Sequence, residues 1–252
     1  MFDDLKGKSV LITGSSTGIG AAVAKGFGRV GARVIVHGNA HSDRAEEVAA
    51  EVRKSGGEAV VALGDVMKAD AVSRMIDKAV DAFGGLDVLV NNAGSLYQRA
   101  PLEKLDEDMY DNVTGINIRP VVLACRLALP QLRKSKGCII NTGSVAGHNG
   151  GGIGIGIYAG AKGFIHSWTR NLALELGPEG IRVNCVSPGV IQTAFHASTP
   201  PDRLEAIRNM IPMRRLGTAD DCVGIYLFLA SGRLAGYIHG QVIEVNGGQY
   251  FK

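Results

Sequence analysis

A glycine-rich turn near the N-terminus constrains the fold of this chain more than any other feature. Residues 13–20 read Thr-Gly-Ser-Ser-Thr-Gly-Ile-Gly, directly after the apolar run 9–12 and at the start of a helix-like segment. The first N–H groups of a helix have no intrahelical partner, and together with the helix dipole they bind anions. Gly14 permits the tight turn, Gly18 the approach of a pyrophosphate, and Gly20 close helix–strand packing. The turn therefore predicts a dinucleotide site; glycines that serve packing alone are the alternative.

Apolar runs and helix-like segments alternate along the whole chain. Short, β-branched and nearly continuous apolar runs are typical of parallel strands covered on both faces. We expect strands near 9–13, 33–37, 59–63, 87–90, 138–142, 182–186 and 241–245. We expect helices near 18–30, 43–54, 69–83, 110–133, 157–176, 202–209 and 219–230. This alternation predicts an α/β fold: a single Rossmann-type doubly wound domain over 1–252, with a central parallel sheet of about seven strands and ligands at the strands' carboxyl ends.

Composition and charge limit the classes of function. A chain of 252 residues with 46% hydrophobic residues suits one α/β domain. The net charge of +3 is spread along the chain without a run of Lys or Arg, so we expect neither nucleic acid nor a membrane surface as a partner. No apolar stretch approaches transmembrane length and the N-terminus does not resemble a signal peptide, which indicates a cytoplasmic protein.

The cysteines and histidines indicate no disulfide and no metal site. The four cysteines are far apart and lie among apolar or small residues, so buried reduced thiols are expected, in agreement with a cytoplasmic location. They are Cys125, Cys138, Cys185 and Cys222. His37 and His41 are four residues apart, at a strand end and in a loop, without a convincing carboxylate or thiol partner. We therefore expect no metal ion.

Chemically distinctive residues follow the later strands of the predicted sheet. Asp65 follows the third strand, where a carboxylate can accept from an adenine amino group. The segment Asn-Asn-Ala-Gly at 91–94 follows the fourth strand and suits backbone that lies against a cofactor. Ser144 follows the fifth strand, and Tyr158 and Lys162 lie four residues apart, on one face of the next long helix. The ordered series, rather than any one pair, indicates a catalytic site.

This series resembles the motifs of the short-chain dehydrogenase/reductase family over essentially the whole chain. The family's cofactor turn matches 13–20, its Asn-Asn-Ala-Gly segment matches 91–94, and 241–248 resembles its last strand and turn. The resemblance implies a catalytic tetrad of Asn117, Ser144, Tyr158 and Lys162. It also implies that the segment from Pro188 to Thr193 holds the nicotinamide carboxamide. Together, turn, strand ends and resemblance predict cofactor contacts by Gly14, Ser16, Thr17, Gly18, Ile19, Asn39, Asp65, Val66, Asn91, Ala93, Gly94, Tyr158, Lys162, Pro188, Gly189, Ile191 and Thr193.

The tetrad has a physical rationale of its own. Tyr158 is expected to be the acid/base, and lowering a tyrosine pKa from about 10 to about 7 requires roughly 4 kcal/mol. One ammonium at about 4 Å supplies a comparable amount at an effective dielectric near 20. We therefore expect Lys162 to lower the pKa of Tyr158 and to bind the nicotinamide ribose. Ser144 would bind the substrate oxygen on which charge develops, and Asn117 would hold a water that passes protons to solvent.

These features predict an NAD(P)-dependent oxidoreductase that interconverts a carbonyl and a secondary alcohol of a small molecule by hydride transfer. Within the family, the chain resembles the 3-oxoacyl-carrier-protein reductases. One alternative is an epimerase or dehydratase on the same scaffold, although such relatives usually carry a longer C-terminal region. The other is a non-catalytic dinucleotide-sensing regulatory protein, although such proteins tend to lose tetrad residues, and this chain has all four.

The residues after the second predicted strand indicate which dinucleotide is preferred. Gly38 occupies the place where NAD-using members usually carry an acidic residue. Asn39 and Arg44 follow, and the N-terminus of the next helix can bind a 2′-phosphate. We therefore expect NADP(H) to be favoured, with NAD(H) possible. Asp43 and the absence of a basic residue in 15–17 count against this preference.

The substrate side carries weaker signals. The segment 194–216 is expected to form a lid over the substrate. The glycine run 150–156 is expected to be mobile without ligand and to border the substrate, the alternative being an ordered path that only glycine can follow. Three arginines can each be an anion ligand or an ordinary surface charge: Arg99, Arg203 and Arg208. The helix 113–132 is apolar almost all round, and the resemblance implies that it forms a subunit interface with 157–176, typically in a homotetramer.

Overall fold

A seven-stranded parallel sheet forms the centre of the computed structural model, which describes residues 1–40, 42–196 and 199–251. Its strand order is β3-β2-β1-β4-β5-β6-β7, and every neighbouring pair is parallel. The strands are β1 (Ser9–Ile12), β2 (Arg33–Gly38), β3 (Glu58–Leu63), β4 (Val88–Asn91), β5 (Cys138–Thr142), β6 (Arg182–Pro188) and β7 (Val242–Val245). The order reverses between β1 and β4, and ligands of such sheets bind at this switch point. The predicted Rossmann-type parallel sheet is confirmed.

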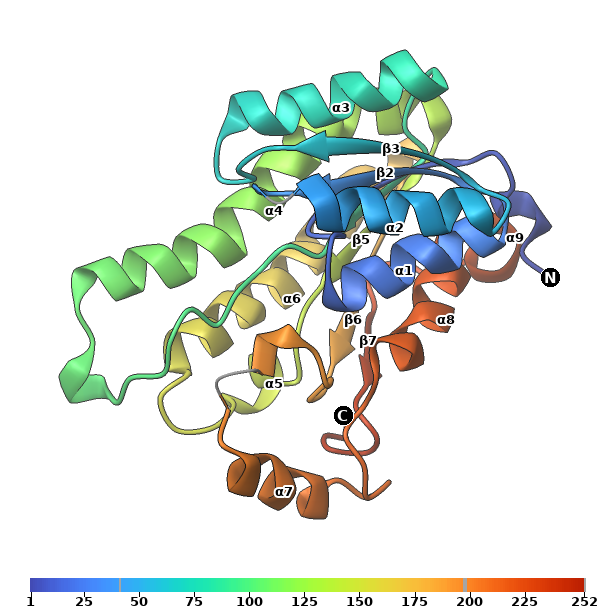
Figure 1. Ribbon diagram of the computed structural model, residues 1–252. Coiled ribbons are helices and arrows are strands. Elements are labelled where there is room, and N and C mark those ends of the chain that lie inside the picture. Colours follow the sequence, from blue (N-terminus) through green and yellow to red (C-terminus); the bar gives the residue numbers. More distant parts are fainter. Residues whose placement is uncertain (41, 197–198, 252) are drawn as a thin grey trace.

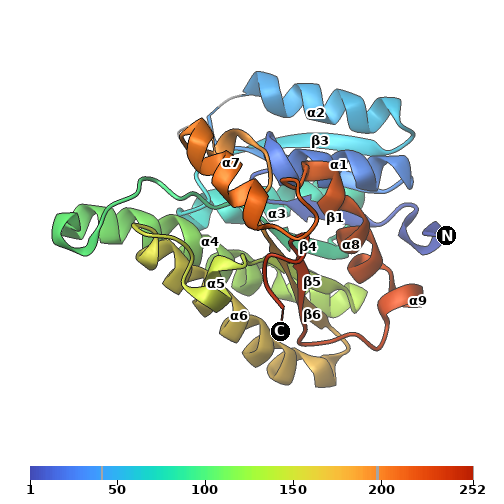
Figure 2. The same ribbon diagram turned by 90° about the horizontal axis from the view of Figure 1, so that it is seen from below.

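Helices cover both faces of the sheet (Figures 1 and 2). The helices are α1 (Gly18–Arg29), α2 (Ser42–Lys54), α3 (Ala69–Phe83), α4 (Glu107–Ser135), α5 (Ala146–Asn149), α6 (Gly156–Leu176), α7 (Pro201–Met210), α8 (Ala219–Ala230) and α9 (Gly232–Ala235). Val10 and Ile12 pack against α1, α2 and α8, whereas Leu11 packs on the opposite face against α3, α4 and α6. Because successive side chains alternate between two covered faces, the strands read as continuous apolar runs.

Most predicted elements lie within three residues of their observed ends. The helix expected at 110–133 begins earlier, because the Asp106 side chain caps it by accepting from Met109 N at 2.7 Å. The short helices α5 and α9 were not predicted, since four residues give no helical periodicity. Short 3₁₀ turns were missed for the same reason; they are η1 (Asp3–Leu5), η2 (Leu102–Lys104), η3 (Gly177–Glu179) and η4 (Ala194–His196).

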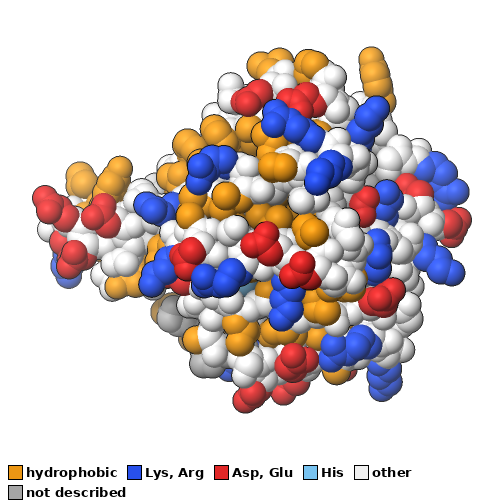
Figure 3. Space-filling model, turned by 90° about the horizontal axis from the view of Figure 1, so that it is seen from above, with side chains coloured by type: hydrophobic (Ala, Val, Ile, Leu, Met, Phe, Trp, Pro, Cys, Tyr) orange, Lys and Arg blue, Asp and Glu red, His pale blue; other side chains and the backbone are white. Residues whose placement is uncertain are grey.

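Helix α4 is longer than the sequence analysis expected and is apolar enough over its length to span a membrane. One 18-residue window reaches a mean hydropathy of 1.2, so the expectation that no stretch approaches transmembrane length is wrong by length and composition. Buried helices of globular proteins reach the same values, and α4 packs against β4, α3 and α6. Its first turns extend beyond the body of the protein (Figures 1 and 3) and carry exposed acidic side chains. These are Asp106, Glu107, Asp108 and Asp111.

The cysteines are buried free thiols, as predicted. Burial raises the pKa of Cys125 and Cys185 to about 12, so both are protonated at neutral pH. Within the described part of the chain, no three His, Cys, Asp or Glu side chains are grouped so that they could hold a metal ion. His41 of the histidine pair considered above lies outside the described residues.

Candidate active site

The glycine-rich turn between β1 and α1 has the backbone that a phosphate site needs. Gly14 and Gly18 adopt φ values of +65° and +58°, which L side chains rarely adopt. A Cβ on Gly14 would also lie 3.0 Å from Ala93 Cα, so β4 approaches the turn closely. A Cβ on Gly18 would lie 3.6 Å from the side chain of Thr193, which places that residue over the turn. The turn therefore brings together backbone donors and residues from two later segments.

Two residues that the sequence analysis did not assign hold this turn in place. His37, at the end of β2, accepts from Gly14 N through Nδ1 (2.7 Å), and its Nε2 lies 2.9 Å from Gly64 O. A carbonyl only accepts, so Nε2 carries the proton; burial lowers the pKa of His37, which favours this neutral ring. Asn92 Nδ2 donates to Thr13 O (3.0 Å) and Gly14 O (3.1 Å). The only sequence signal for a role of Asn92 was its position in the Asn-Asn-Ala-Gly segment.

The expected adenosine contacts lie at the carboxyl ends of β2 and β3. Asp65 uses one carboxylate oxygen to accept from Met67 N at 2.9 Å, which fixes the side chain beside buried Val66. Asn39 is exposed directly after β2. Among the turn residues, Thr17 is exposed, while Ser16 and Ile19 are half-buried.

The side chain of Asn91 serves the interior of the fold. It is buried at the end of β4, where its Nδ2 donates to Asn141 Oδ1 at 2.9 Å and contacts Cys125 Sγ at 3.3 Å. The side chain therefore ties β4 to β5 inside the fold, and the expected cofactor contact of Asn91 stays a prediction. Ala93 and Gly94 continue from it along the switch point.

The segment after β6 crosses the carboxyl edge of the sheet. Pro188 O accepts from Val145 N (3.0 Å), and Gly189 N donates to Val245 O (2.9 Å). Ile191 forms an isolated parallel bridge with Gly217, after which the chain reaches Thr193 above the phosphate turn. This path joins the end of β6 to the glycine-rich turn, and its cofactor contacts stay a prediction.

Asn117 lies in α4, and the oxygen of its buried side-chain amide has no hydrogen-bond donor among the described residues. Its Nδ2 donates to Ser95 O (2.7 Å) and Val113 O (2.8 Å), while Oδ1 has no hydrogen-bond partner among the residues that the structure describes. A Cβ on Gly94 would lie 2.7 Å from this oxygen and 3.4 Å from Lys162 Nζ. Asn117 and Lys162 therefore converge on Gly94, and the oxygen can accept from a water.

Tyr158 and Lys162 converge on the end of β5. Lys162 is buried, 4% exposed, and its Nζ donates to Thr142 O at 2.9 Å. The Tyr158 ring centroid lies 5.7 Å from this Nζ, and its hydroxyl is hydrogen-bonded to Ser144. The tetrad expected from the sequence is thus brought together at the carboxyl edge of the sheet.

The electrostatics differ from the expectation that Lys162 lowers the pKa of Tyr158. Burial raises the pKa of Tyr158 to about 12, and the Ser144 hydrogen bond only partly opposes this. Burial lowers the pKa of Lys162 to about 8. The ammonium points at Thr142 O, so desolvation outweighs charge attraction. At neutral pH the pair is therefore a phenol and a largely protonated amine, which suits proton donation.

The glycine run before α6 follows a path that requires glycine. Gly150, Gly151 and Gly154 have φ values of +78°, +70° and +82°. Gly154 O accepts from Ala100 N at 3.0 Å, and a Cβ on Gly154 would lie 3.2 Å from that nitrogen. These contacts favour the alternative of an ordered path, while the mobility of 150–156 stays a prediction.

Replacement of Gly154 by alanine is expected to lower the free energy of unfolding by about 1–2 kcal/mol, the cost of a left-handed backbone with a Cβ. Gly156→Ala is the matched control, because Gly156 begins α6 and a Cβ there meets nothing within 4 Å among the described residues. The control should be neutral or slightly stabilising. Urea unfolding of both variants measures the difference, and equal stabilities would contradict this account of the loop.

Comparison with known proteins decides the family. The profile of the family described as enoyl-(acyl carrier protein) reductase matches residues 14–249, which is nearly the entire chain. The chain belongs to the short-chain dehydrogenase/reductase family.

Relatives within this family are oxidoreductases. The chain is 35% identical to 3beta-hydroxysteroid dehydrogenase 1 of Eggerthella lenta, covering 98% of this chain and 95% of the relative. It is 37% identical to a 3-oxoacyl-(acyl-carrier-protein) reductase of Staphylococcus epidermidis, covering 96% of this chain and 99% of the relative.

Solved structures of this short-chain dehydrogenase/reductase family superpose closely. The NADH-dependent reductase A1-R′ complexed with NAD is 38% identical, with full coverage of both chains and a TM-score of 0.90. A short-chain dehydrogenase of Burkholderia cenocepacia in complex with NADP is 35% identical, covers 97% of this chain and 98% of its own, and has a TM-score of 0.90. The chain is therefore a nicotinamide dinucleotide-dependent oxidoreductase acting on CH–OH and C=O groups, and this reading stands over the epimerase, dehydratase and regulatory alternatives.

Proposed function

We propose that Tyr158 is the acid/base of this oxidoreductase and that Ser144, Lys162 and Asn117 complete its proton path. The observation that carries the proposal is the convergence of the four side chains on the end of β5. In carbonyl reduction, the Tyr158 hydroxyl donates its proton to the substrate oxygen while the Ser144 hydroxyl donates a hydrogen bond to it. A water on the unpartnered Asn117 Oδ1 then connects buried Lys162 to solvent.

The residues present fit a nicotinamide dinucleotide, because the left-handed Gly14 and Gly18 leave a backbone cradle without Cβ atoms. The turn 14–19 would hold the pyrophosphate. The residues proposed around the rest of the cofactor are Asn39, Asp65, Val66, Asn91, Ala93, Gly94, Tyr158, Lys162, Pro188, Gly189, Ile191 and Thr193. When bound, the cofactor supplies or accepts the hydride. A panel of β-ketoesters, diketones, sugars and polyols, assayed with both cofactors by nicotinamide absorbance, tests the activity; no turnover in the panel with either cofactor would count against it.

NADP(H) is the proposed preference, and a groove between α1 and α2 supports it. Ser16 and Arg44 line this groove together with Glu47 and with Lys25 and Glu51, which pair with each other at 3.5 Å. Gly38 ends β2 without a carboxylate that would repel a 2′-phosphate.

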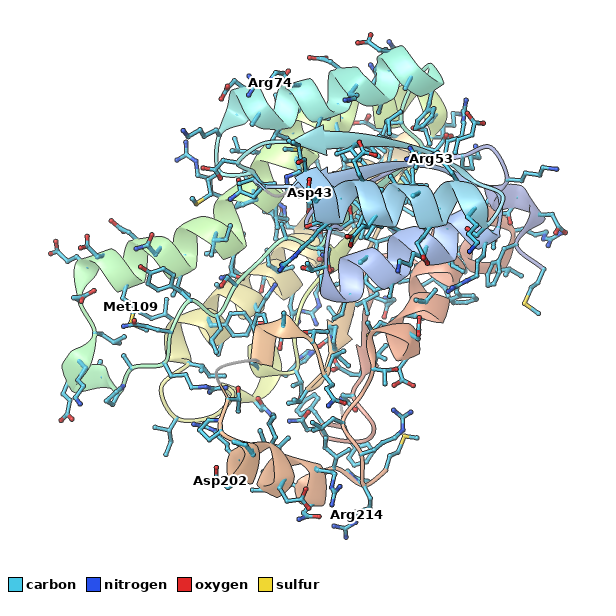
Figure 4. All side chains as sticks on the ribbon, in the orientation of Figure 1. Asp43, Arg53, Arg74, Met109, Asp202 and Arg214 are labelled. Atoms are coloured by element: carbon cyan, nitrogen blue, oxygen red, sulfur yellow. The ribbon has the colours of Figure 1, made fainter. Side chains whose placement is uncertain are left out.

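Kinetics with the two cofactors test this preference. The ratio of catalytic efficiencies with NADPH and NADH should exceed one and fall roughly tenfold in Arg44→Ala, through loss of one charge-assisted contact. Arg53→Ala is the control, because Arg53 lies at the far end of α2 from Asp43 (Figure 4) and is paired with Glu46 at 3.3 Å. A ratio at or below one in the parent protein would refute the preference.

The segment 194–216 is proposed as a substrate lid on a single domain spanning 1–252. Within it, η4 and α7 are described, whereas residues 197–198 lie outside the described part. The Phe195 ring lies 5.7 Å from the Tyr158 ring, and α7 stands apart from the two helix layers (Figure 1). Both observations support a lid beside the reacting group.

A homotetramer in the cytoplasm, with no nucleic acid and no membrane as partner, completes the proposal. The outer parts of α4 and α6 expose large apolar side chains: Tyr110 is 56% exposed and Leu174 82%. Phe164 and Trp168 stack on α6, with ring centroids 5.8 Å apart. Burial of these side chains against further copies supports self-association through α4 and α6. Sedimentation velocity of the full chain tests it, and a monomer at all concentrations would refute it.

A further inference from the structure

Two arginines that are far apart in the sequence lie on either side of the glycine run. Arg203 belongs to α7, and its Nη2 lies 3.1 Å from the position that a Cβ on Gly152 would take. Arg99 directly precedes Ala100, whose N donates to Gly154 O at 3.0 Å. Both side chains are half-buried, so neither is a freely solvated surface charge.

Neither guanidinium is neutralised. In the part of the chain that the structure describes, no ion pair or hydrogen bond is found for Arg99 or Arg203, although Arg208, on the same helix as Arg203, pairs with Glu205 at 2.5 Å. Burial, and then the positive charge of Arg203, lower the pKa of Arg99. Two like charges held near each other are unfavourable unless an anion lies between them. Among the side chains that the structure describes, none compensates the positive charge of these two arginines.

The loop that carries Arg99 packs against the reacting group. Ala100 belongs to the small apolar cluster of Met109 and Val113 against which Tyr158 packs. The loop that carries Arg99 also holds Tyr97 at φ +63°, and strained non-glycine residues of this kind concentrate at ligand sites. The glycines between Ser144 and Tyr158 contribute no side chains that would fill the space between the tetrad and the arginines.

We infer that Arg99 and Arg203 bind an anionic group, a carboxylate or a phosphate, on the carbonyl substrate. Planar guanidinium groups bind such anions through two parallel N–H donors, which gives orientation as well as affinity. The substrate carbonyl then lies at Tyr158, and its charged end lies between the lid helix and the loop after β4. This inference rests on the proposed role of Tyr158.

Paired substrates test the inference. Pyruvate, acetoacetate and levulinate are each compared with their methyl esters, and dihydroxyacetone phosphate with dihydroxyacetone; the carboxylate and phosphate arms distinguish the two anions. For at least one pair, the parent protein should favour the anion by roughly 10- to 100-fold in kcat/KM, the range of a charged hydrogen bond. Arg99→Gln and Arg203→Gln should each lower this ratio about tenfold or more, Arg203→Lys less, and the control Arg208→Gln not at all.

Two kinetic results would overturn the inference. One is a parent protein that prefers the neutral member of every pair. The other is that Arg99→Gln and Arg203→Gln raise the KM of the cofactor but leave the ratio of kcat/KM for anionic and neutral substrates unchanged. The arginines would then bind the cofactor phosphates.

A binding experiment separates this inference from the proposed function. Tyr158→Phe loaded with NADP⁺ is titrated with the acids, the phosphate and their neutral partners while the thermal midpoint is followed. An upward shift with an anion that disappears in the Tyr158→Phe, Arg99→Gln double variant supports the anion site even if the parent turns over no carbonyl. Turnover of neutral carbonyls without any anion-dependent shift leaves the oxidoreductase intact and refutes the anion site.

Discussion

Replacement of Tyr158 by phenylalanine is expected to lower turnover by roughly 10²- to 10⁴-fold, the usual contribution of a positioned acid/base. The substitution removes only the hydroxyl, so the ring keeps its contacts with the apolar cluster of Ala100 and Met109 and with Phe195. Cofactor affinity should therefore stay within a few-fold of the parent. Steady-state kinetics and fluorescence titration with NADPH measure the two quantities.

The Ser144→Ala variant provides a graded comparison for Tyr158→Phe. In the proposed mechanism Ser144 only donates a hydrogen bond to the substrate oxygen, so its loss should lower turnover less than loss of the proton donor. Turnover of Tyr158→Phe within tenfold of the parent would remove Tyr158 from the acid/base role.

Replacement of Lys162 by methionine is expected to damage catalysis and stabilise the fold at the same time. Turnover should fall by at least about 10²-fold and cofactor affinity should also fall, because one ammonium is proposed to serve both the proton path and the ribose. The lowering of the Lys162 pKa from 10.5 to about 8 corresponds to about 3 kcal/mol of unfavourable burial. Loss of the charged hydrogen bond to Thr142 O offsets about 1.5–3 kcal/mol of this. A net gain of about 1 kcal/mol is expected at pH 7.

The stability difference between Lys162→Met and the parent should depend on pH. The folded protein binds the Lys162 proton less tightly than the unfolded chain, so the burial cost is fully present below pH 8. It decreases as the pH rises through 8 and is lost above the unfolded pKa of 10.5. Urea unfolding of the parent and Lys162→Met at pH 7 and near pH 10 measures the difference. A variant that is less stable than the parent at pH 7 would show that the buried ammonium is not under strain.

Local patterns were sufficient to predict the sheet and the long helices. The strands are recognisable because they are short apolar runs rich in β-branched residues and covered on both faces. The glycine turn is recognisable because its backbone conformation requires glycine at fixed positions. The boundaries were less certain, because side-chain caps such as Asp106 determine where a helix begins. The tetrad was predicted from the family resemblance, and the structure brings its members together from α4, α6 and the segment after β5.

Features that depend on distant contacts were not predictable from the sequence. His37 is bound to Gly14 and Gly64, which lie more than twenty positions away on either side, and no local pattern reports this. The direction of the Tyr158 pKa shift depends on burial and on where the Lys162 ammonium points. Arg99 and Arg203 are separated by the whole of α4 and α6, and only the path of the glycine run brings them together.

The strand order has a consequence for the way the protein acquires activity. The strands β1, β2 and β3 pair with one another and emerge first during synthesis, so half of the sheet can form early. The phosphate turn within that half is nevertheless completed by Asn92 and covered by Thr193, which are synthesised later. Cofactor binding should therefore require that the segments after β4 and after β6 have already docked on the turn. In refolding from urea, NADPH binding should not recover before the fluorescence of the single tryptophan, Trp168 in α6. Cofactor binding is then expected to report the assembly of both halves of the sheet.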